Sequence, residues 1–271
     1  MQGSLESRAV NAAHPSKSTQ HRSNGRAPAD PIHLRPTAAP APRALLPGDP
    51  GRALALAQLL LEQPRMFNHH RGLWGYTGTA SDGEPLMVQS TGMGGPSAAI
   101  VLHELIELGV RHAIRVGTCG ALDPLLSLGD LIIAREAIAA DGTSVALGAD
   151  RRTRADPSLT DALAQAARAH LPASTAARCH DGLIVSTDLF YEPSTERNGS
   201  WHAERAVAVE MEASALFAVG AAAGVAVACA LIVTDTFDAS GARTRIDDDS
   251  LVSAVEMLGR AAAAALQSPV G

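Results

Sequence analysis

The chain has no long hydrophobic run and no surplus of basic residues, and each absence excludes a class of protein. A helix that crosses a bilayer needs about 18 or more consecutive apolar residues. No segment reaches that length, so no transmembrane helix is predicted. The formal net charge of -6 argues against a general nucleic-acid binder, because such a protein needs a basic face.

Cysteines are also few. Cys119, Cys179 and Cys229 stand far apart without a CxxC pair, and their odd number provides no disulfide framework. Neither HExxH nor paired Cys/His spacing occurs, so no metal site is predicted, and the adjacent His69 and His70 are expected on the surface. This cysteine usage favours a reducing compartment, and we expect a cytoplasmic protein.

The 271 residues are 46% hydrophobic and 18% charged, which is typical of a globular protein with a full core. Residues 1–42 are rich in Ser, Ala, Pro, Arg and His, and they predict a disordered leader. They lack the apolar segment of a secretory signal, which leaves an ordinary tail or a basic targeting segment as alternatives. Residues 43–271 are then expected to form one domain.

From residue 44 onward, short apolar runs alternate with helical stretches, a pattern typical of layered α/β domains. Strands are predicted at 44–46, 72–79, 85–91, 113–116, 130–134, 182–186, 207–209 and 225–233. Helices are predicted at 51–62, 96–108, 157–170, from 210 through 223, and at 248–266. Several apolar runs lack alternation, which indicates strands covered on both faces. The expected fold is a single-domain, three-layer α/β/α arrangement with a central mixed, twisted sheet.

Arg115 to Gly120 places an arginine and a hydroxyl at the predicted end of an apolar strand. Arg115 offers a planar fork of N–H donors and Thr118 a hydroxyl. Gly117 and Gly120 permit a turn with positive φ and close backbone approach. These features predict an oxyanion site. A buried arginine paired with a carboxylate, beside a packing glycine, is the alternative.

Gly48 to Arg52 forms a second candidate, a glycine turn that opens a helix. The free N–H groups and positive end of a helix attract anions. Asp49 is interpreted as an ordinary helix cap. Arg52 opposes the helix dipole in the first turn, so we expect it to bind an anion rather than to stabilise the helix.

Glu210 and Glu212 lie at the end of a predicted strand whose other residues are apolar and are expected to be buried. Buried carboxylates are unfavourable unless they are paired or hydrogen-bonded. One of them could accept hydrogen bonds from the two hydroxyls of a sugar diol. In the alternative, Glu212 only caps the helix that follows.

Thr234 and Asp235 follow the most apolar run of the chain, residues 226–233. Desolvation there should favour the neutral form of Asp235, as a general acid near neutral pH requires. The alternative is an Asx turn. Because ligands of open α/β sheets gather at strand ends, these sites are expected to converge in one cleft.

Six motifs occur in an order that one enzyme family shares. They are Pro47-Gly48-Asp49-Pro50 with Arg52, Asn68 to Gly78, Thr91-Gly92-Met93-Gly94 with Pro96-Ser97, Arg115 to Gly120, Val209-Glu210-Met211-Glu212-Ala213, and Thr234-Asp235. Through them the chain resembles the nucleoside phosphorylases of the purine nucleoside and uridine phosphorylase family, including the bacterial purine nucleoside phosphorylases.

The resemblance implies a role for each matching residue. Phosphate would be bound by Gly48, Arg52, Arg115 and Thr118, and by Arg71 of a neighbouring subunit. Ribose would be bound by Met93, Glu210, Met211 and Glu212, and by His33 of a neighbouring subunit. The base would contact Phe190, Thr234 and Asp235, with Asp235 as the catalytic proton donor. Arg243 or Arg245 would assist the proton transfer.

The implied reaction is phosphorolysis of a nucleoside to free base and ribose 1-phosphate, with inorganic phosphate as co-substrate and neither a metal nor an organic cofactor. Relatives imply a homo-oligomer, a hexamer built as a trimer of dimers, with shared sites. Asp235 favours purines, and Thr195-Glu196-Arg197 lacks the glutamine with which uridine phosphorylases read uracil. A uridine phosphorylase, a hydrolase of methylthioadenosine type and a non-catalytic nucleoside-binding protein are the alternatives.

Overall fold

The computed structural model describes residues 31–172, 177–191, 195–238 and 242–267. The strands in these ranges are β1 (Arg43–Leu46), β2 (Glu62–Asn68), β3 (Gly75–Thr79), β4 (Pro85–Gln89), β5 (His112–Ala121), β6 (Leu131–Ala140), β7 (Arg152–Arg154), β8 (Cys179–Thr187), β9 (Ala206–Glu210), β10 (Ala226–Phe237) and β11 (Arg243–Arg245). The helices are α1 (Pro50–Leu60), α2 (Gly95–Glu107), α3 (Gly142–Ala146), α4 (Pro157–His170), α5 (Thr195–Ala203), α6 (Ala213–Ala223) and α7 (Asp248–Gln267), with a short 3₁₀ turn, η1 (His70–Gly72).

The strands form one mixed sheet in which β5 is central. β5 pairs in parallel with β1 and β10 and antiparallel with β9. β10 also pairs with β6, β6 with β8, and β8 with β9, so these five strands close into a ring. β4, β3 and β2 continue outward from β1 as an open wing. The mixed sheet was predicted, whereas the closed ring was not.

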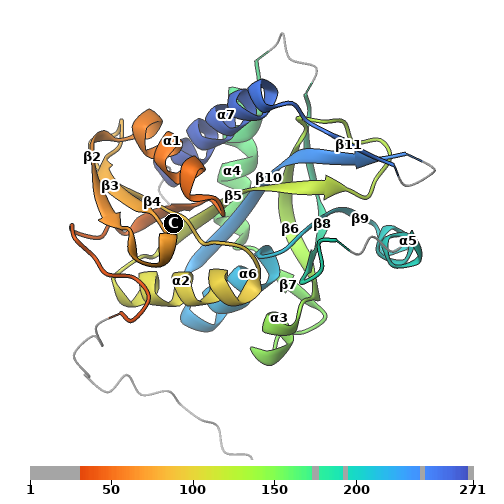
Figure 1. Cartoon of the computed structure of the whole chain (residues 1–271), viewed down its shortest axis with the longest axis horizontal. Helices are drawn as coiled ribbons and strands as arrows, with labels where there is room; N and C mark the ends of the chain where they lie inside the picture. Colours follow the sequence, from red (N-terminus) through yellow and green to blue (C-terminus); the bar gives the residue numbers. More distant parts are fainter. Residues whose placement is uncertain (1–30, 173–176, 192–194, 239–241, 268–271) are drawn as a thin grey trace, which may run out of the picture.

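Helices cover both faces of the sheet, which confirms the predicted α/β/α layers. Figure 1 shows α1, α4 and α7 on one face and α2, α3 and α6 on the other. The core beneath the first set includes Leu56, Leu163 and Leu258, all of which are buried. The core beneath the second includes Leu102 and Phe217. The central strands are therefore buried on both sides, as their continuous apolar runs require.

Local signals set the ends of several helices. Asp49 Oδ1 accepts a hydrogen bond from Arg52 N at 2.7 Å, so Asp49 caps α1 as interpreted. Asp156 caps α4 in the same way, through Leu159 N at 2.8 Å. α6 ends at Gly224, whose φ of 65° lies in the left-handed region that glycine adopts most readily.

Several boundaries differ from prediction: β5, β6 and β10 extend past the predicted 113–116, 130–134 and 225–233, and the strand predicted at 72–79 begins at Gly75. The helix predicted at 51–62 ends at Leu60, and β2 follows it. β2 lacked a sequence signal because it lies at the outer edge of the wing, its first five residues are exposed, and it contains Pro64. An edge strand of this kind has no apolar alternation to mark it.

Part of the predicted leader packs onto the domain. Residues 1–30 lie outside the described ranges. Within 31–42, Leu34 is fully buried and its N–H donates to Glu104 Oε2 at 2.7 Å. Thr37 N donates to Phe67 O at 2.8 Å on β2. The packed chain thus begins before the predicted boundary at residue 43.

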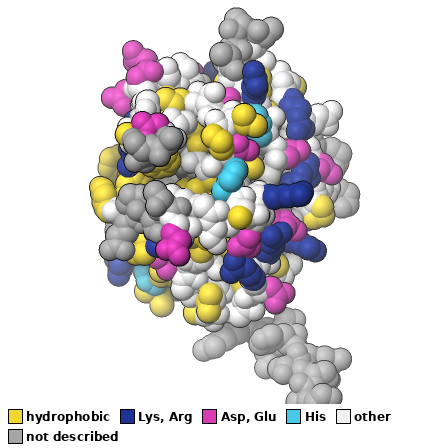
Figure 2. Space-filling view, turned by 90° about the vertical axis from the view of Figure 1, so that its right-hand side faces the viewer, with side chains coloured by type: hydrophobic (Ala, Val, Ile, Leu, Met, Phe, Trp, Pro, Cys, Tyr) yellow, Lys and Arg dark blue, Asp and Glu magenta, His cyan; other side chains and the backbone are white. Residues whose placement is uncertain are grey.

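Opposite charges are interspersed on the face that carries α5 and β11, where Figure 2 shows dark blue and magenta side chains next to one another. Ion pairs of β6, β7 and their surroundings join Arg154 to Glu136 at 2.8 Å, Arg135 to Asp161 at 2.7 Å and Arg168 to Asp181 at 3.0 Å.

None of the helices in the described ranges is both long and apolar enough to cross a bilayer.

Candidate active site

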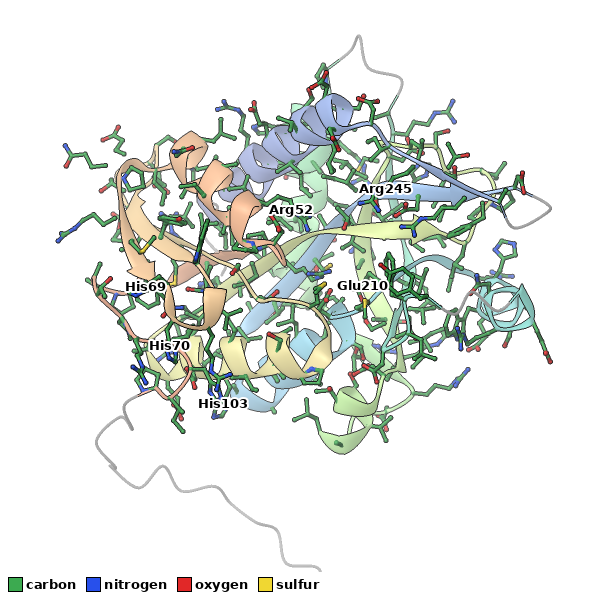
Figure 3. The ribbon with its side chains drawn as sticks, in the orientation of Figure 1. Arg52, His69, His70, His103, Glu210 and Arg245 are labelled. Atoms are coloured by element: carbon green, nitrogen blue, oxygen red, sulfur yellow. The ribbon has the colours of Figure 1, made fainter. Side chains whose placement is uncertain are left out.

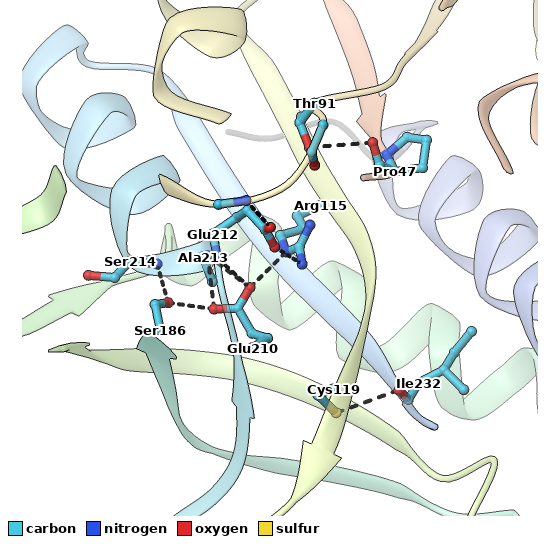
Figure 4. A network of polar contacts seen from close by, with 12 residues as sticks. Pro47, Thr91, Arg115, Cys119, Ser186, Glu210, Glu212, Ala213, Ser214 and Ile232 are labelled. Carbon is cyan, nitrogen blue, oxygen red and sulfur yellow. Dashed lines mark hydrogen bonds and ion pairs between the residues drawn. The ribbon is translucent and has the colours of Figure 1, made fainter. Parts of the chain in front are cut away.

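The site lies where the chain leaves β1, β4 and β9 and where β5 and β10 run past them (Figure 4). The loops after β1 and β4 are joined by two backbone hydrogen bonds, from Thr91 N to Pro47 O at 2.9 Å and from Gly92 N to Gly48 O at 3.0 Å. A Cβ atom at Gly48 would lie 3.2 Å from Gly92 O, so glycine allows this close approach. The predicted convergence of these motifs is therefore found.

The segment from Arg115 to Gly120 is strand rather than turn. It continues β5, and the ladder to β10 pairs Gly117 with Leu231 and Thr118 with Ile232. Neither Gly117 nor Gly120 has a positive φ, so the predicted turn is wrong. The glycine at 117 serves a different purpose, because a Cβ there would lie 2.8 Å from Cζ of Arg115. Gly117 leaves room for the guanidinium.

Arg115 is buried between two carboxylates (Figure 4). Its Nε donates to Glu210 Oε2 at 3.0 Å and its Nη2 to Glu212 Oε2. Its Nη1 is also buried, but it has no hydrogen-bond partner, and it lies 4.0 Å from the position of a Cβ at Gly48. Burial opposes the charged form of Arg115, yet Glu212 and Glu210 raise its pKa above the ordinary value. Arg115 is thus both ion-paired and left with one free donor at the loops.

The Glu210 carboxylate binds the backbone N–H groups at the start of α6. Its oxygens accept from Glu212 N at 2.9 Å and Ala213 N at 3.0 Å, and its Oε1 accepts from Ser186 Oγ. Burial raises the pKa of Glu210, and the Glu212 carboxylate adds to this, while Arg115 and Ser186 act in the opposite direction. Glu210 is therefore engaged within the protein.

Glu212 stands at the N-cap position of α6 but makes no side-chain cap bond there, so the alternative in which its carboxylate only caps the helix is wrong. Its Oε1 instead accepts from Gly94 N in the loop before α2, and its Oε2 accepts from Arg115. Neighbouring Met211 is half-buried. This arrangement puts a buried carboxylate beside the glycine loop at 92–95, next to the arginine.

Arg52 is the second cation here. Burial, and after it the positive charge of Arg115, lower the pKa of Arg52. Two guanidinium groups that repel each other in a partly desolvated place are stabilised by an anion that both can reach. Arg52 lies in the first turn of α1 near the sheet ends (Figure 3), and Thr118 is half-buried on β5.

Asp235 lies within β10 and is buried, so the alternative of an Asx turn is wrong. Its Oδ2 accepts from Thr234 Oγ1 at 2.8 Å and its Oδ1 from Arg243 Nε at 2.7 Å, while Arg245 Nη1 lies 3.9 Å away. The Arg243 guanidinium also stacks on the ring of Phe190, 5.0 Å from its centroid. The three base-site residues predicted from the resemblance therefore lie together.

Two predicted residues lie away from this cluster. Arg71 is exposed in η1, and its neighbours His69 and His70 lie at the wing, well apart from Arg52 and Glu210 in Figure 3. His33 is near them, because its O contacts His70 Nδ1 at 3.0 Å and its own Nδ1 contacts Glu104 Oε1 at 2.7 Å. Arg71 and His33 do not complete the site of their own chain.

Met93 is 86% exposed, although it is carried by the loop that contacts Glu212.

The sequence analysis missed Ser186, which donates a hydrogen bond to Glu210, and it did not choose between Arg243 and Arg245. Ser186 is the last residue of a predicted strand, the same signal that marked the other candidates, so it could have been found. Among the residues that the structure describes, no three His, Cys, Asp or Glu side chains form a group suited to a metal ion.

Comparison of the sequence with known proteins identifies the family of the chain. The model of the Phosphorylase superfamily matches residues 42–267, and the chain belongs to this family.

Relatives in three bacteria are each called purine nucleoside phosphorylase DeoD-type. The protein of Clostridium novyi is 38% identical over 193 residues, which cover 71% of this chain and 81% of the relative. That of Clostridium beijerinckii is 38% identical over 208 residues, covering 76% and 86%. That of Geobacillus kaustophilus is 38% identical over 200 residues, covering 72% and 81%.

Proposed function

We propose that this protein cleaves the N-glycosidic bond of purine nucleosides with inorganic phosphate, releasing the free base and ribose 1-phosphate. One observation carries the proposal: the buried Nη1 of Arg115 is left without a partner beside Gly48. Arg52 is close enough that the charge of Arg115 lowers its pKa. A phosphate dianion satisfies that donor and relieves the repulsion between the two arginines. The names of the relatives support the same reaction.

The bond breaks through a sugar that carries positive charge, while the departing base carries negative charge. Phosphate held by Arg52, Arg115 and the Gly48 loop is positioned to attack the anomeric carbon. Glu212 accepts hydrogen bonds from the sugar hydroxyls and stabilises the cationic sugar. Phosphate oxygen then forms the new bond to carbon as the bond to the base nitrogen breaks.

The base takes its proton from Asp235. Arg243 lies 2.7 Å from Asp235 and also on Phe190, so it aligns the acid with the ring against which a base stacks. After transfer, the Asp235 carboxylate is stabilised by the same guanidinium. A ring nitrogen of a purine is the acceptor that this acid suits, which favours purines over uracil.

The proposed reaction needs neither a metal nor an organic cofactor, since the nucleophile is inorganic phosphate and the acid is a side chain. We propose that the active unit is a homo-oligomer, a hexamer arranged as a trimer of dimers. Three residues support this. Arg71 and Met93 are exposed, and Arg71 and His33 lie beside His70 at the wing rather than at the site of their own chain. We place the protein in the cytoplasm.

The test is chromatographic assay of adenosine, inosine and uridine, each with and without phosphate. We expect release of base from at least one purine nucleoside only when phosphate is present. Phosphate-dependent loss of uridine alone would indicate a uridine phosphorylase. Cleavage without phosphate would indicate a hydrolase, and binding without turnover a non-catalytic binding protein; each of these results contradicts the proposal.

A further inference from the structure

Behind Glu210 lies a cluster of buried hydroxyl groups that the proposed reaction does not use. We call Ser144, Thr153, Ser186 and Ser214 the hydroxyl cluster; all four are buried. Ser214 Oγ accepts from Ser144 Oγ at 2.8 Å and from Thr153 Oγ1 at 3.1 Å. Ser186 joins the cluster differently, because its Oγ accepts from the backbone Ser214 N at 2.8 Å. Within the hydroxyl cluster, the hydrogen bond to Glu210 is made by Ser186.

The single proton of Ser186 has a defined destination. A serine hydroxyl donates one hydrogen bond, and a carboxylate only accepts. Because Ser186 Oγ already accepts from Ser214 N, its O–H points at Glu210 Oε1. Ser186 and Glu210 are also direct partners in the parallel ladder of β8 and β9, which fixes their separation. The strand pairing thus aims the hydroxyl at the carboxylate.

Glu210 in turn orients Arg115. Its oxygens are held by Glu212 N and Ala213 N on one side and by Ser186 on the other, so Oε2 faces Arg115 Nε at 3.0 Å. The guanidinium is planar, so fixing Nε and Nη2 also fixes where Nη1 points. Nη1 is the donor without a partner.

We propose that Ser186 is a positioning residue for phosphate, acting through Glu210 on Arg115. The inference rests on the proposed function, because it takes Nη1 of Arg115 as a phosphate donor. Ser186 does not touch phosphate or nucleoside in this arrangement. Its effect is on the direction of the Arg115 guanidinium and on the charge of Glu210.

If Ser186 acts through the charge of Glu210, its loss should change the pH dependence of phosphate binding, which a purely packing role of Ser186 would not do. The ionisable groups around Glu210 are Arg115 and Cys119 on β5, Cys229 on β10 and Glu212 at the start of α6. Burial raises the pKa of both thiols, so they stay neutral. A hydrogen bond donated to a carboxylate favours its ionised form. Loss of the Ser186 hydroxyl therefore makes Glu210 take up its proton at higher pH and release Arg115.

The experiment uses the full chain with Ser186→Ala and Ser186→Cys. Cysteine is somewhat larger than serine and is a weak donor, so a cavity cannot explain an effect that both variants share. We expect the KM for phosphate to rise about tenfold in both, as loss of one hydrogen bond to a charged group predicts, with the KM for nucleoside changed less than about twofold. We expect Ser186→Thr, which keeps the hydroxyl, to restore most of the phosphate affinity.

The pH profile completes the test. Dividing kcat/KM for phosphate of each variant by that of the unaltered protein cancels the titration of phosphate itself. We expect this ratio to fall as the pH is lowered from about 8 to about 6. Ser144→Ala is the matched control, because it removes a buried hydroxyl of the same cluster that does not touch Glu210; its phosphate KM and pH ratio should stay unchanged.

Two results would overturn the inference: an unchanged phosphate KM in folded Ser186→Ala and Ser186→Cys, or an equal loss in Ser144→Ala. Failure of the proposed function looks different, since the unaltered protein would then cleave no nucleoside with phosphate. In that case calorimetric titration with inorganic phosphate replaces the KM. Weaker binding by both Ser186 variants would support the inference, and equal binding would overturn it.

Discussion

Asp235 on β10 and Arg243 on β11 meet diagonally across the antiparallel pair, with Oδ1 of the acid 2.7 Å from Nε of the arginine, although the register partner of Asp235 is Arg245. The same guanidinium stacks on Phe190, so one cation contacts both the proposed acid and the proposed stacking ring. The arrangement places three base-site groups on three separate segments of the chain.

Replacing the proposed acid Asp235 should lower the rate with 6-aminopurine nucleosides more than the rate with 6-oxopurine nucleosides. We expect Asp235→Asn to lower kcat/KM for 6-aminopurine nucleosides by about a hundredfold or more, because a general acid contributes about 10² to 10⁴ in rate. The effect on 6-oxopurine nucleosides should be smaller. Steady-state kinetics with adenosine and inosine measure both, and an equal loss on the two substrates would argue against Asp235 as the acid.

The two arginines of β11 form a matched pair. Arg243 bonds Asp235 directly, whereas Arg245 Nη1 lies 3.9 Å away and its side chain is 63% exposed. We expect Arg243→Met to lower kcat by about tenfold or more, because it removes a charge-assisted hydrogen bond, and Arg245→Met to change it by less than about threefold. Turnover of adenosine by each variant checks this. The reverse order would assign the role to Arg245.

Arg71 should act on the site of another subunit. We expect Arg71→Ala to weaken phosphate binding, which raises the KM for phosphate. Because the Arg71 side chain is exposed, the melting temperature should stay within about 2 °C of that of the unaltered protein. A phosphate KM that does not change in this variant would contradict a shared site.

Mixing experiments sharpen that test. Arg52→Ala and Arg71→Ala, each impaired alone, are unfolded and refolded together so that subunits mix. If sites are shared, some sites in the mixed oligomers combine an intact Arg52 with an intact Arg71, and activity exceeds that of either variant refolded alone. No gain in activity on mixing would mean that both residues serve one chain.

Gly117 should be needed for the arginine rather than for a turn. A Cβ in Gly117→Ala lies 2.8 Å from Cζ of Arg115 and 2.9 Å from Cδ2 of Leu231, so the guanidinium must move. We expect the phosphate KM to rise about tenfold, in line with about 1.4 kcal/mol lost at one charged contact. Gly199→Ala, in α5 with open space around its Cβ, is the control and should leave it unchanged.

Glu104 should make stability depend on pH. Its buried carboxylate accepts from His33 N at 2.9 Å and Leu34 N at 2.7 Å. Desolvation opposes ionisation, but these hydrogen bonds and that from the His33 ring lower the pKa of Glu104 overall. A lowered folded-state pKa adds stability above the unfolded value, and this stability is lost as pH falls through the folded value.

We therefore expect Glu104→Gln to reduce the free energy of unfolding by about 1 to 3 kcal/mol near neutral pH. The difference from the unaltered protein should shrink as the pH falls below about 4. Urea unfolding at several pH values measures it. A difference that does not depend on pH would mean that the carboxylate charge is not the cause.

The layered fold could be predicted because apolar runs and helix caps are local. The helix at 157–170 has the predicted ends, as its cap at Asp156 and its apolar stripe are written in adjacent residues. The ring of strands could not be predicted from the sequence. The pairing of β5 with β9 and β10 joins segments roughly 90 or more residues apart, and it follows from packing. That pairing also keeps Arg115 to Gly120 in a strand.

The site shows the same division. Polar residues at the ends of apolar runs marked Glu210, Glu212 and Asp235, because burying them needs partners. Which partner each one takes depends on register between distant strands. Ser186 carried the same strand-end signal, but its bond to Glu210 depends on the pairing of β8 with β9, and the bond of Arg243 to Asp235 depends on the pairing of β11 with β10.

The most direct test of the central claim is phosphorus NMR of a reaction of purine nucleoside, phosphate and the unaltered protein, followed against the released base. We predict that inorganic phosphate is consumed in equal amount to the base released and reappears as the ester ribose 1-phosphate, and that Arg115→Met abolishes this conversion. Release of base with free ribose and unchanged phosphate would contradict the account.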